Sequence, residues 1–347
     1  MDNMLCKKYF GASNSAEGFV NYFPRIFNKD ICSRIYVVKG GPGTGKSRFM
    51  RDVASAAESR GMSLKYYYCS SDSNSLDGII IEDMRVGFVD GTAPHVYEPT
   101  SVGSFEQILN LGDFWDEKML AADRERIEAL GKNKASAYDR AYMLLSAYGK
   151  LLLAAESLTE PCVNHKKLAS AVKRWLHKLP ISGEHAKEVA LCRAVGMNGK
   201  ARFDTYEREA EMIFTVSDYY GSAHFVMSAI FREAAVLGMS VRLSYDPVMK
   251  DRIDAVLLPD CGILFVCGAD GEHKINAKRF VDEDRFKPVK ERVKRLENEA
   301  KNIEELALSE FEKIMAYHFS LEEIFISAMD FERKERFTED FIKKLFE

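Results

Sequence analysis

Eight residues near the N-terminus, "GGPGTGKS", have the types and spacing of a loop that binds phosphate groups. They follow the pattern G-x-x-x-x-G-K-S, with the fixed positions at Gly40, Gly45, Lys46 and Ser47. Glycines let the backbone turn sharply and direct successive N–H groups toward phosphate oxygens at the positive end of a helix. The lysine can then reach the terminal phosphates of a nucleoside triphosphate, and the serine hydroxyl can bind magnesium.

The elements around this loop are those that a phosphate-binding loop needs. Residues 35–38, immediately upstream, are β-branched and aromatic and predict a buried strand. Downstream, apolar residues at helical spacing predict a helix that ends near Gly61. We therefore expect the whole loop to contact the nucleotide. The nucleotide-binding residues predicted are Gly40, Gly41, Pro42, Gly43, Thr44, Gly45, Lys46, Ser47 and Arg48.

A site of this kind also needs a carboxylate on a neighbouring strand to hold the hydrated metal ion. Residues 86–89 predict a second buried strand, and Asp90 follows it at the carboxyl end. That edge of the sheet is where α/β proteins bind ligands. We expect Ser47 and Asp90 to be the metal ligands, and Lys46 and Asp90 to be catalytic.

Two further residues are candidates for catalysis. Asp72 lies in a serine-rich loop that follows a strand predicted for Leu64–Tyr68. His95 follows the metal carboxylate, with an ordinary loop histidine as the alternative interpretation. The metal carboxylate itself is followed by Gly91 and not by the glutamate that many ATPases use to activate water. The general base therefore stays open among four residues: Asp72, Glu82, His95 and Glu98.

The two halves of the chain resemble each other. Residues 35–91 align without a gap with residues 212–268, at an offset of 212 − 35 = 177, and eleven positions are identical. Composition alone gives about three or four identities over this length. "FWDE" after the first copy recurs as "FVDE" after the second. The sequence predicts a tandem duplication.

The phosphate-binding residues are not repeated. "SDYYGSAH" stands opposite "GGPGTGKS", so that Ala223 faces Lys46. Cys267 faces Asp90. The combined loss of the lysine, the metal serine and the metal carboxylate predicts that only the first half binds a nucleotide.

Helical patterns follow each predicted α/β core. In the first half, Ser104 and Gln107 resemble a capping box, and Asp116 opens a charged helix expected to end at Gly131. In the second half, a long mixed-charge helix follows Pro288. Its charge runs are most simply solvated faces, and a coiled-coil surface for a partner is the alternative. The apolar residues behind that alternative are Val289, Val293, Leu296, Ala300 and Ile303.

Two segments outside these cores also carry predictions. Residues 11–23, "GASNSAEGFVNYF", predict a capped helix that packs against the first core. The first half has 11 more residues than the second between Gly91 and Phe114, compared with Gly268 and Phe280, since 23 − 12 = 11. This insertion is expected to form a lid or a substrate wall.

Composition limits the classes of function. The chain of 347 residues is 46% hydrophobic and 29% charged, as expected for two globular domains. Its net charge of −4 provides no general attraction to nucleic acid or to anionic membranes. The seven cysteines are scattered and form no C-x-x-C pair, so reduced thiols are expected. "MDNMLCKKYF" lacks the apolar stretch of a secretory signal, and we expect a cytoplasmic protein.

The succession of "KGGPGTGKS", "CSSDSNSLDG", "VGFVDGTAPH" and "NLGDFWDE", followed by a weaker second copy, resembles the poorly characterised bacterial tandem P-loop ATP-binding proteins. The resemblance covers most of the chain, although only the first motif is specific to P-loop NTPases in general. It implies ATP as the nucleotide. A second P-loop can occur in that group, so its absence here is a departure, and it indicates one nucleotide site per chain.

The fold predicted is α/β, with two tandem P-loop NTPase-like α/β/α cores, each followed by a helical appendage. The expected domains are residues 1–183, with an appendage over about 104–180, and residues 184–347, with an appendage over about 286–347. Three functions are compatible with a Mg²⁺-ATP site in the first domain. They are an ATPase that drives movement between the halves, a small-molecule or nucleotide kinase, and a slow ATP-dependent regulatory module whose helices contact a protein partner. The oligomeric state stays open.

Overall fold

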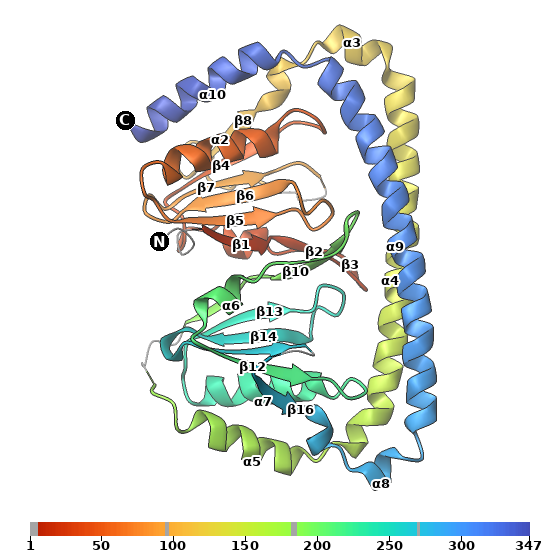
Figure 1. Ribbon diagram of the computed structural model, residues 1–347. Helices are drawn as coiled ribbons and strands as arrows, with labels where there is room; N and C mark the ends of the chain where they lie inside the picture. The colour runs from red at the N-terminus through yellow and green to blue at the C-terminus, as the bar shows by residue number, and fades with distance from the viewer. Residues whose placement is uncertain (1–5, 94–96, 182–185, 269–270) are drawn as a thin grey trace.

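The computed structural model describes residues 6–93, 97–181, 186–268 and 271–347. Two six-stranded mixed sheets, each accompanied by helices, lie one above the other, and a pair of long helices runs along one side of both (Figure 1). The fold class is α/β, as predicted from the sequence. Among the described residues, no helix combines the length and the apolar character needed to cross a bilayer.

The first sheet has the strand order β1-β5-β6-β7-β4-β8. β6 is antiparallel to both neighbours, and the other adjacent pairs are parallel. The strands are β1 (Cys6–Phe10), β4 (Arg34–Lys39), β5 (Leu64–Tyr68), β6 (Leu76–Ile81), β7 (Val86–Asp90) and β8 (Glu106–Asn110). The capping box expected at Ser104 and Gln107 is wrong, because this segment enters the sheet as an edge strand beside β4.

The second sheet repeats this topology. Its order is β16-β12-β15-β14-β13-β9. Read from the other edge, this is the order of the first sheet with each strand replaced by its counterpart, and the parallel and antiparallel pairs correspond. The strands are β9 (Lys187–Val189), β12 (Met212–Ser217), β13 (Val241–Tyr245), β14 (Ile253–Leu258), β15 (Ile263–Cys267) and β16 (His273–Asn276). One topology in both halves is what a tandem duplication predicts.

In each half, a two-stranded hairpin lies in the sequence between the first and second strands of the six-stranded sheet. The segment predicted to be an N-terminal helix instead forms β2 (Ala12–Ser15) and β3 (Gly18–Asn21), and only α1 (Phe23–Ile26) is helical. Gly18 has a φ of +96°, which glycine adopts without strain, and the chain reverses here. The counterpart is β10 (Arg193–Gly196) with β11 (Gly199–Arg202).

The hairpins connect the two halves reciprocally. Met197 N donates to the carbonyl of Ser71 in the first half, at 2.7 Å. Ala16 N donates to the carbonyl of Val248 in the second, at 3.0 Å. Ser71 and Val248 are equivalent in the alignment, since 248 − 71 = 177. The hairpin of the second half therefore reaches the loop that follows β5, and the hairpin of the first half reaches the loop that follows β13.

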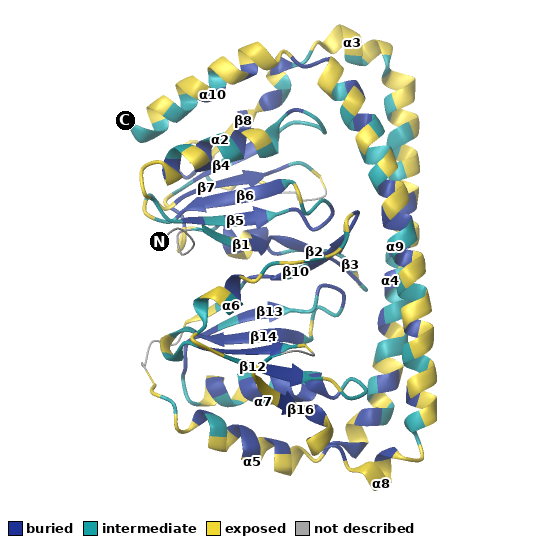
Figure 2. Cartoon of the chain, in the orientation of Figure 1, coloured by how far each residue is buried: buried dark blue, intermediate teal, exposed yellow. Residues whose placement is uncertain are grey.

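The two sheets share one core between their facing sides. Val37 and Val89 of the first sheet belong to the same buried cluster as Leu257 and Val266 of the second. The opposite faces are covered by α2 (Lys46–Glu58) and α7 (Ala223–Val236). The separate α/β/α layering expected for each half is thus replaced on the inner side by the other half, together with α1, the short α6 (Thr205–Glu209) and the hairpins (Figure 2).

The long helices are α4 (Arg124–Thr159) and α9 (Lys290–Ser327), each preceded by a short helix, α3 (Glu117–Ala122) or α8 (Glu283–Phe286). They run antiparallel, since Lys134 lies against His318 and Arg140 pairs with Glu310. Asp116 caps α3 as predicted. The predicted helix end at Gly131 is wrong, because α4 continues through it.

The apolar face of α9, whose alternative interpretation was a coiled-coil surface for a partner, packs against α4 of the same chain. Val293 and Ala300 are fully buried. Small residues of α4 such as Ala137 and Ala141 are also fully buried, and they share a cluster with Ala307 and other apolar residues of α9. The charged residues lie mainly on the outer side of the pair (Figure 2).

The final helix of each half packs on the other half. α5 (His165–Leu176) follows α4 but shares its buried cluster with α7 of the second half. α10 (Phe331–Phe346) ends the chain but packs on α2 of the first half, where the rings of Phe341 and Phe49 are 5.4 Å apart. The helix pair therefore carries each appendage across to the opposite sheet (Figure 1).

One buried amide tests the contact between the halves. Asn14 is fully buried, donates to the carbonyl of Val195 at 2.7 Å and accepts from the Tyr142 hydroxyl at 2.9 Å. Asn14→Ala leaves both partners unsatisfied, so we expect urea denaturation to show a loss of about 2 kcal/mol in the free energy of unfolding. Asn302→Ala, on the exposed side of α9, is the control and should cost less than about 0.5 kcal/mol. Equal effects would contradict this assignment.

Candidate functional site

The loop predicted to bind phosphate, residues 40–47 and called the phosphate loop below, connects β4 to α2. Gly43 and Gly45 have φ values of +70° and +76°, which disfavour any side chain. A Cβ at Gly43 would also lie 2.9 Å from the backbone oxygen of Glu322. Lys46 is the first residue of α2, and its Nζ donates to the carbonyls of Gly40 and Gly41 at 2.8 and 2.9 Å. The sequence thus forms the tight strand-to-helix turn that its glycines predict.

Asp90 lies directly beside this loop. β7 is the parallel neighbour of β4, and Asp90 is in register with Val38. Its Oδ2 is 3.6 Å from Lys46 Nζ, and its Oδ1 accepts from Thr92 N at 2.8 Å. Burial raises the pKa of Asp90, and the positive charge of Lys46 opposes that rise. Ser47 Oγ accepts from Leu76 N at 3.0 Å, so the hydroxyl is held at the mouth of the loop.

These groups line a cavity of about 400 Å³ at the carboxyl edge of the first sheet. Residues 42–47 form one wall, and Asp72 and Asp90 belong to another. Gly40 and Gly41 are outside the lining, and their carbonyls hold Lys46. Arg48, also predicted to bind the nucleotide, does not line this cavity, and its largely exposed side chain pairs with Asp52 at 3.0 Å.

The remaining candidates for the general base separate clearly. Asp72 lines the cavity. Glu82 does not, since it pairs with Lys7 and Lys65 beyond the opposite end of β6. Glu98 pairs with Lys39 at 3.3 Å and is also outside the lining. His95 lies outside the described residues.

The insertion expected to form a lid does not line the cavity in its described part, residues 97–105. Tyr97 is buried in the shared core, where its hydroxyl donates to the carbonyl of Phe27 at 3.1 Å. Phe105 is buried in the same core. This segment is therefore anchored away from the phosphate loop.

The far wall of the cavity comes from the helix pair, which the sequence did not connect with the loop. Lys134 and Tyr138 of α4 line it, as do His318 and Glu322 of α9. Met197, at the tip of the β10-β11 hairpin, completes it from the second half. Only the three-dimensional arrangement identifies these residues, since no motif in the sequence contains them.

The polar groups of this wall form a chain. Lys134 Nζ lies 3.0 Å from His318 Nδ1, and His318 Nε2 lies 3.6 Å from Glu322 Oε1. Burial and then the charges of Lys134 and Lys46 lower the pKa of His318 to about 4. Neutral His318 can therefore accept from Lys134 through Nδ1. Burial lowers the pKa of Lys134, and burial followed by the charge of Asp72 raises that of Glu322.

The equivalent loop of the second half, residues 217–224, is closed by its own side chain. The Asp218 carboxylate accepts from Gly221 N at 2.9 Å and from Ala223 N at 2.8 Å. These are the counterparts of the N–H groups of Thr44 and Lys46, since 221 − 44 = 177 and 223 − 46 = 177. Within the second half, a carboxylate thus takes the place that an anion would occupy.

Charged side chains also close the space beyond that loop. After the "FWDE" and "FVDE" motifs the two halves correspond at an offset of 280 − 114 = 166, so Glu156 is the counterpart of Glu322. Glu156 accepts from Arg252 at 2.5 Å and lies 3.6 Å from His224 Nε2. The two halves therefore share a scaffold but differ at the loop. The first presents Lys46 to a cavity, and the second pairs the N–H groups of Gly221 and Ala223 with Asp218.

Comparison with protein-family models, with curated proteins and with solved structures finds no match for this chain. The function must therefore be argued from the site.

The buried histidine predicts a pH dependence. His318 titrates near 6.5 when unfolded but only near pH 4 when folded, so the unfolded chain binds the proton first as the pH falls. Stability is therefore lost between pH 6.5 and 4, by about 3 kcal/mol from this group. His318→Gln keeps an acceptor for Lys134 and removes the titration.

Urea denaturation of the wild type and of His318→Gln at several pH values measures this loss. The difference between the two proteins cancels the carboxylates, including Glu322 and Asp90, whose raised pKa values act in the opposite direction. We expect the variant to gain relative stability only below about pH 6.5. A difference that does not change with pH would contradict the buried, neutral state of His318.

Proposed function

We propose that the protein is a Mg²⁺-dependent P-loop ATPase with one nucleotide site, in the N-terminal half, and a second half that serves as scaffold. One observation carries the proposal. Lys46, Ser47 and Asp90 converge on a single cavity, whereas the N–H groups of the equivalent second loop are already bonded to Asp218. ATP, rather than another triphosphate, is favoured by the resemblance to the tandem P-loop ATP-binding proteins.

The residues of the first loop fit a triphosphate. The N-cap residue of α2 is Gly45, which has no side chain to accept from the first N–H groups of the helix, so these groups can donate to phosphate oxygens. Lys46 can exchange its two carbonyl partners for the β- and γ-phosphates. Glycine at position 43 lets the loop pack closely against α9, because a Cβ there would collide with Glu322 and Ile326.

Magnesium would be held jointly by protein and nucleotide. Ser47 Oγ accepts one hydrogen bond and keeps a lone pair, and Asp90 lies beside the loop to bind the hydrated ion. Among the described residues, no group of three or more His, Cys, Asp or Glu side chains is placed to hold a metal on its own. The proposed ion therefore takes its remaining ligands from phosphate and water.

Hydrolysis needs a nucleophilic water, an acceptor for its proton and positive charge around the transferred group. The water oxygen forms a bond to the γ-phosphorus, while the bond from that phosphorus to the β,γ-bridging oxygen breaks and its electron pair leaves with ADP. Asp72 and Glu322 are the carboxylates placed to accept the proton, and Lys134 supplies a second ammonium opposite Lys46. This arrangement compensates for the glycine at position 91.

A regulatory module with slow turnover is the second candidate. The observation that favours it is the origin of the far wall, because Lys134 and Glu322 belong to the helix pair that joins both halves. A nucleotide in this cavity would contact that pair directly. Turnover rate separates this candidate from the ATPase.

Nucleotide binding tests the site assignment. Lys46→Ala removes the ammonium that reaches the phosphates, so we expect it to abolish the rise in melting temperature produced by Mg²⁺-ATP. Ala223→Lys in the second loop should create no additional site, because Asp218 still occupies the N–H groups. Unchanged stabilisation of Lys46→Ala by Mg²⁺-ATP would overturn the assignment.

The reaction is tested with γ-labelled ATP, magnesium and a panel of nucleosides and metabolites. Free labelled phosphate supports the ATPase, and label retained on tightly bound ATP supports the regulatory module. Label on a small molecule would reject both in favour of a kinase. For the ATPase, Lys134→Ala should lower turnover about a hundredfold with a smaller effect on ATP binding. Exposed Lys132→Ala on the same helix is the control and should change neither.

A further inference from the structure

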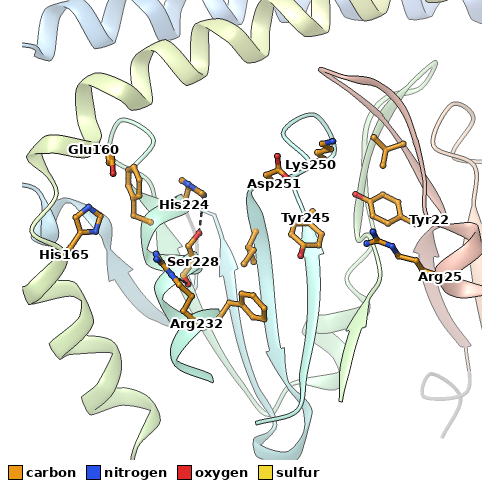
Figure 3. A pocket seen from close by; sticks show the side chains of 14 residues that line it. Tyr22, Arg25, Glu160, His165, His224, Ser228, Arg232, Tyr245, Lys250 and Asp251 are labelled. Atoms are coloured by element: carbon orange, nitrogen blue, oxygen red, sulfur yellow. Dashed lines mark hydrogen bonds between the residues drawn. The ribbon is translucent and has the colours of Figure 1, made fainter. Parts of the chain in front are cut away.

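A second cavity, of about 720 Å³, lies in the other half of the molecule. Its base is formed by the end of β13, the start of β14 and the first turns of α7 (Figure 3). α1 of the first half borders it on one side, and the junction of α4 with α5 borders it on the other. It shares no lining residue with the cavity of the phosphate loop.

The duplication explains why this space is open. In the first half, the guanidinium of Arg51 lies over the ring of Tyr68, 5.9 Å from its centre, and donates to the carbonyl of Asn74 at 2.5 Å. The counterparts in the second half are Ser228 for Arg51 and Tyr245 for Tyr68, both at the offset of 177. The tyrosine is thus retained while the planar group above it is lost, which leaves room over Tyr245.

The walls of this cavity have the chemistry of a ligand site. Tyr22 and Tyr245 offer aromatic rings, and Figure 3 shows the side chains of Arg25 and Arg232 on opposite sides of Tyr245. Among the ion pairs of the described residues, neither arginine has a carboxylate partner, whereas nearby Lys250 is paired with Glu17 at 2.5 Å. Ser228 adds a hydroxyl. Unpaired guanidinium groups next to aromatic rings favour an anion that carries a planar ring.

We propose that this cavity binds a small molecule made of a planar ring and a phosphate or carboxylate group. The ring lies over Tyr245, in the place that Arg51 takes over Tyr68. The anionic group is directed to Arg25 on one side of that ring or to Arg232 on the other. The second half has lost the residues that bind phosphate in the first half. It would thus keep a ligand site of a different kind, formed by the first turns of α7 with β13 and β14.

The test compares four probes by calorimetric titration, with a non-hydrolysable ATP analogue saturating the phosphate loop. Uridine monophosphate and 4-hydroxybenzoate combine a ring with an anion, whereas uridine has only the ring and inorganic phosphate only the anion. We expect binding of at least one of the first two, about tenfold or more tighter than that of either uridine or phosphate. The two ring-bearing anions distinguish a phosphorylated ligand from a carboxylate.

Variants locate the binding. Ser228→Arg restores the side chain found at the equivalent position of the first half, so it should occupy the space over the Tyr245 ring and abolish binding without lowering the melting temperature. At least one of the variants Arg25→Ala and Arg232→Ala should weaken binding about tenfold or more, and an unchanged affinity in both would contradict the proposal. Lys46→Ala should bind the probe as the wild type does, which separates this site from the proposed nucleotide site. The proposal is overturned if neither ring-bearing anion binds, if phosphate alone binds as tightly, or if Ser228→Arg leaves binding intact.

Discussion

The reciprocal exchange between the two halves is the constraint on which the structure depends. Each hairpin donates to the loop of the other half, through Met197 to Ser71 and through Ala16 to Val248. Short bridges repeat the exchange at the ends of the helix pair, where Trp115 meets Met329 and Val163 meets Val281. Because each half buries the face that the other leaves open, neither sheet has a complete core of its own. The two halves therefore exchange hairpins and terminal helices, as the subunits of a domain-swapped dimer do, but within one chain.

This exchange determines which parts of the fold could be predicted from the sequence. β5 and the strand that ends at Asp90 are short apolar runs with turn residues on both sides, and these local patterns are sufficient. The duplication follows from the alignment. The helix end predicted at Gly131 is wrong because the helix propensity of one glycine is outweighed by tertiary packing. Here α4 packs on α9 and continues past this residue.

The residues of the candidate site likewise fall into those that the sequence predicts and those that only the fold brings together. Residues 42–47 and Asp90 were predicted because the chemistry of phosphate binding needs fixed residue types at a fixed spacing along one strand-loop-helix unit. Lys134 and His318 could not be predicted as part of this cavity. They lie 88 and 272 positions after Lys46 (134 − 46 = 88, 318 − 46 = 272), and the sequence does not show that the two helices carrying them pack together beside the loop. Arg48 follows the motif, but helical geometry turns it outward to Asp52, one turn along α2.

The proposed function also gives the helix pair a physical reason to respond to the nucleotide. The Glu322 carboxylate accepts from the N–H of Gly43, and that N–H belongs to the loop a phosphate would occupy. Two anions cannot share this position without repulsion in a partly buried site. A bound triphosphate must therefore displace Glu322 or favour its protonated form, which its raised pKa already makes easier. Because Glu322 is fixed on α9 and α9 continues to the opposite sheet, displacement at the loop acts on an element common to both halves. In the second half, the counterpart Glu156 is bound to Arg252, and Asp218 already accepts from the N–H groups of the loop, so this competition with phosphate arises only in the first half.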